Sequence, residues 1–121
     1  MLPSRALREM ARQVYLYVLP LQANRWYVGS STNVAQRVAA HRAGSGAAFT
    51  QAFRPVGPPA VIRKAGGTTP VGLQEDQLCL EYMCVYGIDR VRGGSHCAVT
   101  LPEAQRAALE RIVRHAHNVC L

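Results

Sequence analysis

The chain has 121 residues, of which 49% are hydrophobic and 17% are charged. This length suits one domain around one hydrophobic core, and the composition excludes a wholly disordered chain. No apolar run approaches the roughly 20 residues that a membrane-spanning helix needs. We therefore expect residues 1–121 to form one soluble domain.

Positive charge is concentrated in the first part of the chain. Residues 1–74 contain nine basic residues and one acidic residue, a net of +8, whereas residues 75–121 carry a net of −1. All basic residues except Lys64 are arginines, whose planar guanidinium suits bidentate contacts to phosphate. A polyanion is therefore the first partner to consider, and arginines that serve only solubility are the alternative.

The cysteines and histidines offer two further sites to weigh. Four cysteines could form two disulfides, but Pro20 interrupts the apolar stretch 14–21 and no secretory cleavage pattern follows, so we expect reduced thiols and a cytoplasmic protein. A structural zinc site is the weaker alternative, because its candidate ligands lack a CxxC spacing and two of the histidines do not share a helical face. These candidates are His96, Cys97, His115, His117 and Cys120.

The first half of the chain predicts a helix, a hairpin and a second helix. Helical spacing of apolar residues indicates a short helix over 4–12. Residues 14–19 and 26–28 are β-branched and aromatic, with a turn between them, and predict a β-hairpin. Gly29 then breaks the strand, and residues 30–32 offer capping hydroxyls to a helix through Asn33 to Arg42.

The second half alternates one more strand with helices. Residues 47–54 predict a short helical turn, 60–64 a third strand, and 70–86 a long helix that begins after Thr69 as N-cap and ends at Gly87. Residues 92–95 predict a loop, and a C-terminal helix over about 101–118 follows a capping-box pattern. The elements together indicate an α/β domain of the α+β type with a central, mainly antiparallel three-stranded sheet flanked by helices.

Five residues in these elements could cleave a phosphodiester. Tyr15 and Tyr27 lie on adjacent strands, where both phenols can face one surface, and Arg37 and His41 share a helical face. Glu75 lies in the second turn of the 70–86 helix. Such cleavage needs a hard cation on oxygen ligands, a cationic donor for the phosphate, and a group that orients or deprotonates water. Taken singly, each residue also suits ordinary packing or a solvated helix face, and only their joint arrangement favours a site.

The order of these motifs resembles the GIY-YIG nuclease superfamily. Val14-Tyr15-Leu16 stands at the first signature, Tyr27-Val28-Gly29 at the second, and the segment after Ser30 leads to Arg37 and His41. Glu75 resembles the metal-binding glutamate of the family, and the similarity covers residues 14–95. The resemblance implies that Glu75 holds one divalent ion, Mg²⁺ or Mn²⁺, and that Arg37 neutralises phosphate charge. It also implies that Tyr15 or Tyr27 positions the attacking water and that His41 contacts the phosphate or shares the role of base.

Three positions depart from that pattern or compete with it. Gln13 replaces the glycine that usually opens the first signature, and Ser30 stands where excision-repair members carry lysine. Glu81 is a second carboxylate on the same predicted helix, six residues beyond Glu75 and on a different face. Motif register favours Glu75 as the ligand.

The function that we expect is a metal-dependent endonuclease acting on DNA. The sequence leaves the strand state open, with single-stranded DNA among the candidates. Residues expected to contact the nucleic acid are Ser30, Arg42, Arg54, Arg63, Lys64 and Arg92, and Phe49 and Phe53 could stack on a base or pack in the core. A catalytically silent nucleic-acid-binding module on the same scaffold is the nearest alternative, and a protein-interaction domain is a third.

Overall fold

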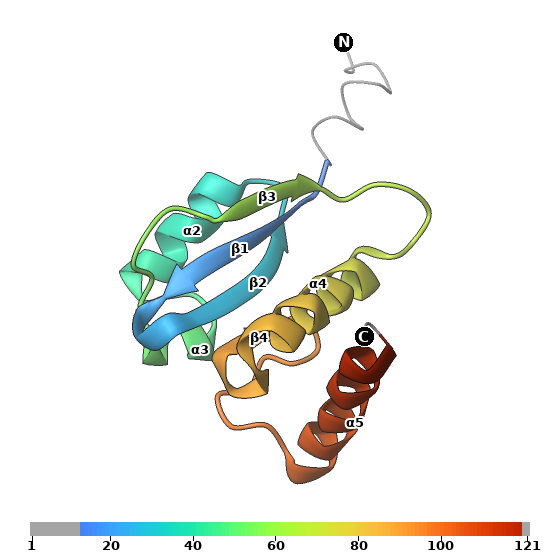
Figure 1. Ribbon diagram of the computed structural model, residues 1–121. Helices are drawn as coiled ribbons and strands as arrows, with labels where there is room; N and C mark the ends of the chain where they lie inside the picture. The colour runs from blue at the N-terminus through green and yellow to red at the C-terminus, as the bar shows by residue number, and fades with distance from the viewer. Residues whose placement is uncertain (1–12, 120–121) are drawn as a thin grey trace.

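The computed structural model of the protein describes residues 13–119, and the helix predicted over 4–12 lies outside this range. Strands β1 (Tyr15–Leu21) and β2 (Arg25–Ser31) form the predicted antiparallel hairpin, closed by the 3-10 turn η1 (Gln22–Asn24). Strand β3 (Val61–Lys64) pairs antiparallel with the other edge of β1. The predicted hairpin and third strand are thereby confirmed (Figure 1).

A fourth strand corrects the predicted sheet. Strand β4 (Val91–Gly93) pairs with β2 in parallel, so the sheet is mixed and has the order β3-β1-β2-β4. The sequence predicted three strands and a loop over 92–95 because a segment of three residues that contains Arg92 and Gly93 shows no alternation. A short 3-10 turn, η2 (Ile88–Arg90), leads into this strand.

The helices follow the predicted ranges closely. They are α2 (Val34–Ala43), α3 (Ala48–Ala52), α4 (Val71–Tyr86) and α5 (Glu103–Val119). The side chain of Asn33 caps α2 by accepting from the backbone N–H of Gln36, whereas α4 has Pro70 rather than Thr69 at its N-cap position. Across the described part of the chain, no helix has both the length and the apolar character to span a membrane.

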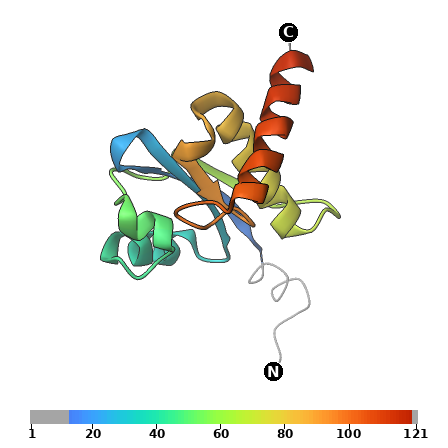
Figure 2. The same cartoon turned by 90° about the horizontal axis from the view of Figure 1, so that it is seen from below.

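The two faces of the sheet carry two separate hydrophobic clusters. Helices α2 and α3 cover one face, and α4 and α5 cover the other (Figure 2). Alternate residues of β1 point to opposite faces, so Tyr17 and Leu19 pack with Tyr27 under α2 and α3. Leu16 and Val18 pack instead under α4 and α5, against Val28, Leu78, Cys79, Met83 and Leu109. The face under α2 and α3 holds Tyr17 and Tyr27 of the candidate site.

Candidate functional site

The candidate site lies at the C-terminal end of β2. Strand β4 pairs only with Trp26, Tyr27 and Val28, so β2 continues past it through Gly29 to Ser31. At this end, α2 contributes Arg37 and His41 from one side of the sheet, and α4 contributes Glu75 from the other. The structure therefore brings segments from three separate elements to one strand end.

The tyrosine that contacts His41 is Tyr17 rather than Tyr15. The hydroxyl of Tyr17 lies 2.7 Å from Nε2 of His41, and the ring of Tyr27 lies 5.0 Å from the imidazole. Tyr15 lies two residues away on the same face, half-buried and paired with Ser31 and Lys64. Tyr15 and Tyr27 lie on one face of the hairpin, as predicted, but the phenol beside His41 is that of Tyr17. Because strand residues two apart share a face, the sequence pattern could not choose between the two phenols.

Gly29 makes room for the phenol of Tyr17. Tyr17 lies directly opposite Gly29 in the hairpin, and a Cβ at this position would stand 2.5 Å from the Tyr17 hydroxyl oxygen. Any side chain there would displace the phenol from His41. The close approach of the two strands therefore requires a glycine at position 29.

His41 is fully buried and has polar partners on both ring nitrogens. Its Nδ1 lies 2.9 Å from the hydroxyl of Thr50, which is also fully buried. Burial, together with the nearby Arg37 guanidinium, lowers the pKa of His41 to about 4. His41 is therefore neutral at pH 7. Sequence reasoning missed Thr50, which lies on another helix and has no motif around it.

Both tyrosines of the site are protonated at neutral pH. Burial is the main cause that raises the pKa of Tyr17 and of Tyr27 above the ordinary value of a phenol. The Glu75 carboxylate adds to both shifts, and the Arg37 guanidinium opposes them. The charges of Arg37 and Glu75 therefore act in opposite directions on the pKa of each phenol.

Arg37 and Glu75 supply the opposite charges of the site. Arg37 is half-buried and lines a cavity of about 200 Å³ with Ser31, Asn33, Gln36 and Ala40. Glu75 accepts a hydrogen bond from the hydroxyl of Ser30. Ser30, which we expected to contact nucleic acid, thus orients the carboxylate in this structure.

Glu75 and Glu81 occupy different environments on α4. Glu75 is half-buried, and its charge helps to raise the pKa of Tyr17 and of Tyr27. Glu81 is exposed, and its charge helps to raise the pKa of Tyr82. The neighbouring Asp76 accepts hydrogen bonds from the backbone N–H and the hydroxyl of Ser95. Glu75 is therefore the carboxylate of α4 that is held at β2 by Ser30 and whose charge affects both tyrosines.

The donor set around Glu75 suits a hydrated divalent ion. Within residues 13–119, no group of three or more His, Cys, Asp or Glu side chains could hold a metal. An ion at Glu75 would thus have at most two such side chains as ligands, with water and phosphate oxygens completing its coordination. Mg²⁺ accepts this arrangement, because it retains several waters and often binds through one or two carboxylates and the substrate phosphate.

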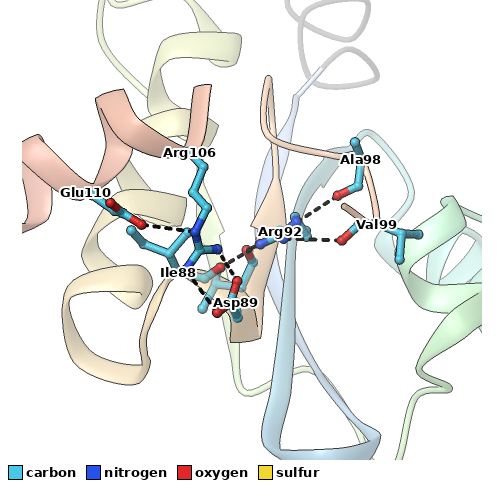
Figure 3. Close-up of polar contacts among 8 residues, drawn as sticks. Ile88, Asp89, Arg92, Ala98, Val99, Arg106 and Glu110 are labelled. Carbon is cyan, nitrogen blue, oxygen red and sulfur yellow. Dashed lines mark hydrogen bonds and ion pairs between the residues drawn. The ribbon is translucent and has the colours of Figure 1, made fainter. Parts of the chain in front are cut away.

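Arg92 is a structural residue, contrary to the prediction that it contacts nucleic acid. Its side chain is 3% exposed, and its guanidinium donates to the carbonyls of Ile88, Val91, Ala98 and Val99 at 2.5 to 3.2 Å (Figure 3). Arg92 therefore links the loop after β4 to the turn before β4 through hydrogen bonds. Figure 3 also shows Arg106 of α5 held between Asp89 and Glu110.

The other predicted nucleic-acid contacts lie on the surface. Arg42, Arg54, Arg63 and Lys64 are exposed. Two of these side chains already make hydrogen bonds within the protein. Arg42 donates to the carbonyl of Gly57, and Arg54 donates to the carbonyl of Arg42. Of the two phenylalanines, Phe49 is buried in the core. The guanidinium of Arg25 stacks over the ring of Phe53, at 4.0 Å from its centre.

The alternative zinc ligands have other partners where the structure describes them. Nδ1 of His96 lies 2.7 Å from the side-chain amide of Gln105, and Nε2 of His117 lies 2.8 Å from the carbonyl of Cys84. Cys97 and His115 are exposed, and Cys120 lies outside the described residues. The described members of this set therefore do not converge on one point.

Comparisons with known proteins find one family model that matches part of the first half of the chain. Residues 13–69 match the model of the GIY-YIG catalytic domain, a segment that contains Tyr17, Tyr27, Arg37 and His41 and ends before Glu75. No solved structure matches the chain.

Three relatives are proteins named UPF0213. The protein of Staphylococcus haemolyticus is 45% identical over 42 residues, which are 35% of this chain and 51% of that protein. The protein of Cupriavidus pinatubonensis is 44% identical over 45 residues, 37% and 50% of the two chains, and that of Natronomonas pharaonis is 47% identical over 47 residues, 39% and 55%. The chain spans about half the length of the curated relatives that it matches.

Proposed function

We propose that the protein is a metal-dependent endonuclease that hydrolyses phosphodiester bonds in DNA, because residues 13–69 match the model of the GIY-YIG catalytic domain and GIY-YIG domains belong to a nuclease family. The observation that carries the proposal is the convergence of Tyr17, His41, Arg37 and Glu75 at one end of β2. GIY-YIG nucleases act on nucleic acid. We propose in addition that the substrate is DNA and that the reaction needs a metal ion.

Charge recognition of the substrate falls to Arg37 and Glu75. Arg37 would bind the scissile phosphate through its guanidinium, which matches the geometry of a phosphate. Glu75, held by the hydroxyl of Ser30, would bind one Mg²⁺ or Mn²⁺ ion. When bound, the ion supplies Lewis-acid stabilisation of the negative charge that develops on the phosphate oxygens.

Proton transfer falls to the pair of Tyr17 and His41. In the proposed step, the attacking water gives a proton to the Tyr17 oxygen while the Tyr17 proton passes to Nε2 of His41. The water oxygen bonds to phosphorus, the bond to the leaving sugar oxygen breaks, and this oxygen takes a proton from solvent. Tyr17 is thus a phenol before and after the step, so its raised pKa does not oppose the reaction.

Substrate binding would also prepare His41 to accept that proton. The Arg37 charge is one of the two causes that lower the pKa of His41. A phosphate bound to Arg37 would offset this charge, because two opposite charges close together cancel much of their effect on a third group. We therefore expect His41 to become a stronger base in the complex than in the free protein.

Cleavage assays test this function directly. The full chain, incubated with labelled single-stranded and duplex DNA, is expected to cut at least one substrate with Mg²⁺ or Mn²⁺, and to stop when EDTA removes the ion, because charge on the phosphate then lacks its counter-ion. Binding without cutting of either substrate under all metal conditions would contradict the proposal and favour the silent binding module. Cutting that persists in EDTA would contradict the metal dependence alone.

Exposed basic residues should govern the salt dependence of DNA binding. Lys64→Gln is expected to lower the slope of log affinity against log salt by about 1, since each phosphate contact releases about one counter-ion. The matched control is Arg111→Gln on α5, an exposed residue with the same loss of charge, which should leave the slope unchanged. Equal effects of the two variants would show that Lys64 makes no specific phosphate contact.

A further inference from the structure

The structure contains a chain of hydrogen bonds that runs behind the candidate site. It leads from the hydroxyl of Tyr17 to Nε2 of His41, from Nδ1 of His41 to the hydroxyl of Thr50, and from this hydroxyl to the carbonyl oxygen of Ala47. The contacts measure 2.7, 2.9 and 2.9 Å. Thr50 and His41 have no exposed surface, so water does not compete for the two hydrogen bonds of the imidazole.

The last contact fixes the direction of every proton in this chain. The carbonyl oxygen of Ala47 can only accept a hydrogen bond, and two acceptor oxygens 2.9 Å apart with no proton between them would repel each other. The single proton of Thr50 therefore points to Ala47, and the Thr50 oxygen must accept from His41. It follows that Nδ1 of His41 carries a proton.

The neutral state of His41 then leaves its other nitrogen bare. A neutral imidazole has one N–H, so Nε2 is an acceptor. The Tyr17 hydroxyl, which is protonated at neutral pH, donates to it. The Tyr17 oxygen, which also interacts with Arg37, keeps acceptor capacity for a hydrogen bond from the attacking water.

The surroundings hold the imidazole in this orientation. A Cβ at Gly46 would lie 2.1 Å from Nδ1 of His41, so the backbone after α2 packs directly on the ring. The rings of Tyr17 and Tyr27 stand 6.0 and 5.0 Å from it on other sides. Packing fixes where the ring lies, and the hydroxyl of Thr50 is what selects between its two tautomers.

We propose that Thr50 is a positioning residue of the catalytic site, which holds His41 as the Nδ1–H tautomer so that Tyr17 directs its proton to His41 and its oxygen to the attacking water. This inference rests on the proposed nuclease function for its catalytic consequence. The tautomer itself is a property of the free protein, and it can be measured whether or not the protein cuts DNA.

Two variants separate the hydroxyl from the shape of the side chain. Thr50→Val removes the hydroxyl at nearly constant volume, and the carbonyl of Ala47 keeps a partner in the backbone N–H of Gln51 at 3.1 Å. Thr50→Ser keeps the hydroxyl and removes the methyl group. A role in packing alone would make the serine variant at least as damaging as the valine variant.

Nitrogen-15 NMR of the imidazole is the direct test. In the wild-type protein near pH 7, we expect a protonated Nδ1 and a bare Nε2 for His41, the same pattern in Thr50→Ser, and a shift toward the Nε2–H tautomer in Thr50→Val. His41→Gln identifies the resonances of His41 among those of the other histidines. A wild-type His41 protonated on Nε2 would overturn the inference, even if the protein is a nuclease.

Single-turnover cleavage measures the catalytic consequence. We expect Thr50→Val to lower the rate by about 10- to 100-fold, the usual effect of removing a partner that orients a catalytic group, and Thr50→Ser to stay within about threefold of wild type. Thermal unfolding shows whether each variant is folded. A folded Thr50→Val protein that cuts at the wild-type rate would overturn the inference. Absence of cleavage by the wild type would instead contradict the proposed function and leave the NMR result to decide the tautomer.

Discussion

Tyr17→Phe is expected to lower the single-turnover rate of DNA cleavage by at least about 100-fold, the scale of effect that general acid–base groups have. The substitution removes only the hydroxyl, which lies 2.7 Å from Nε2 of His41 and through which the proton of the attacking water would pass. The aromatic ring remains, so the buried cluster under α2 and α3 keeps its packing. Binding of DNA should therefore change little while the rate falls.

Tyr15→Phe is the matched control for this result. It removes the same atom from the same strand face, two residues away, where the side chain is half-buried and lies opposite Ser31. We expect its cleavage rate to remain within about twofold of wild type, as for a group outside the proton path. A large loss in Tyr15→Phe with normal cleavage by Tyr17→Phe would show that Tyr15 is the catalytic tyrosine, as the sequence predicted. The contact between Tyr17 and His41 would then be structural.

Arg92→Ala should destabilise the protein by about 3 kcal/mol or more, because it leaves buried carbonyl oxygens without the guanidinium that satisfies them. Four carbonyls accept from this side chain, and they belong both to the turn before β4 and to the loop after it. Urea unfolding followed by circular dichroism measures the change. Loss of the contacts should also loosen the segment that connects the sheet to α5.

Arg90→Ala provides the control for Arg92→Ala. Arg90 is exposed and lies two residues earlier, so its loss should change the free energy of unfolding by no more than about 0.5 kcal/mol. An Arg92→Ala protein as stable as wild type, with a reduced salt dependence of DNA binding, would instead support the original interpretation of Arg92 as a phosphate contact.

The sequence predicted most of the fold because most elements have local signals. The hairpin has β-branched and aromatic residues on both sides of a turn, and α4 ends at Gly87, which has a φ of 100° that favours glycine. Strand β4 has no such signal. Its three residues become a strand only because α4 and η2 bring them beside β2.

The same distinction applies to the candidate site. Arg37 and His41 could be grouped from their spacing, since one helical turn places both on one face. The choice of Tyr17 over Tyr15 depends on depth in the core, and the role of Thr50 depends on a contact between α2 and α3. Arg92 lost its predicted role because the loop of residues 98–99 returns over its side chain. These outcomes are set by tertiary contacts, which a local pattern does not contain.

The most direct test of the account compares Glu75→Gln with Glu81→Gln in cleavage assays with Mg²⁺. Both variants remove one carboxylate charge from α4 and retain nearly the same side-chain shape. We expect Glu75→Gln to lose at least about 100-fold in rate, the scale of effect when a group that stabilises the developing charge is removed, and Glu81→Gln to cut like wild type. Normal cleavage by Glu75→Gln would contradict the proposed function, because cleavage would then continue without the carboxylate that we propose as the ligand of the metal ion.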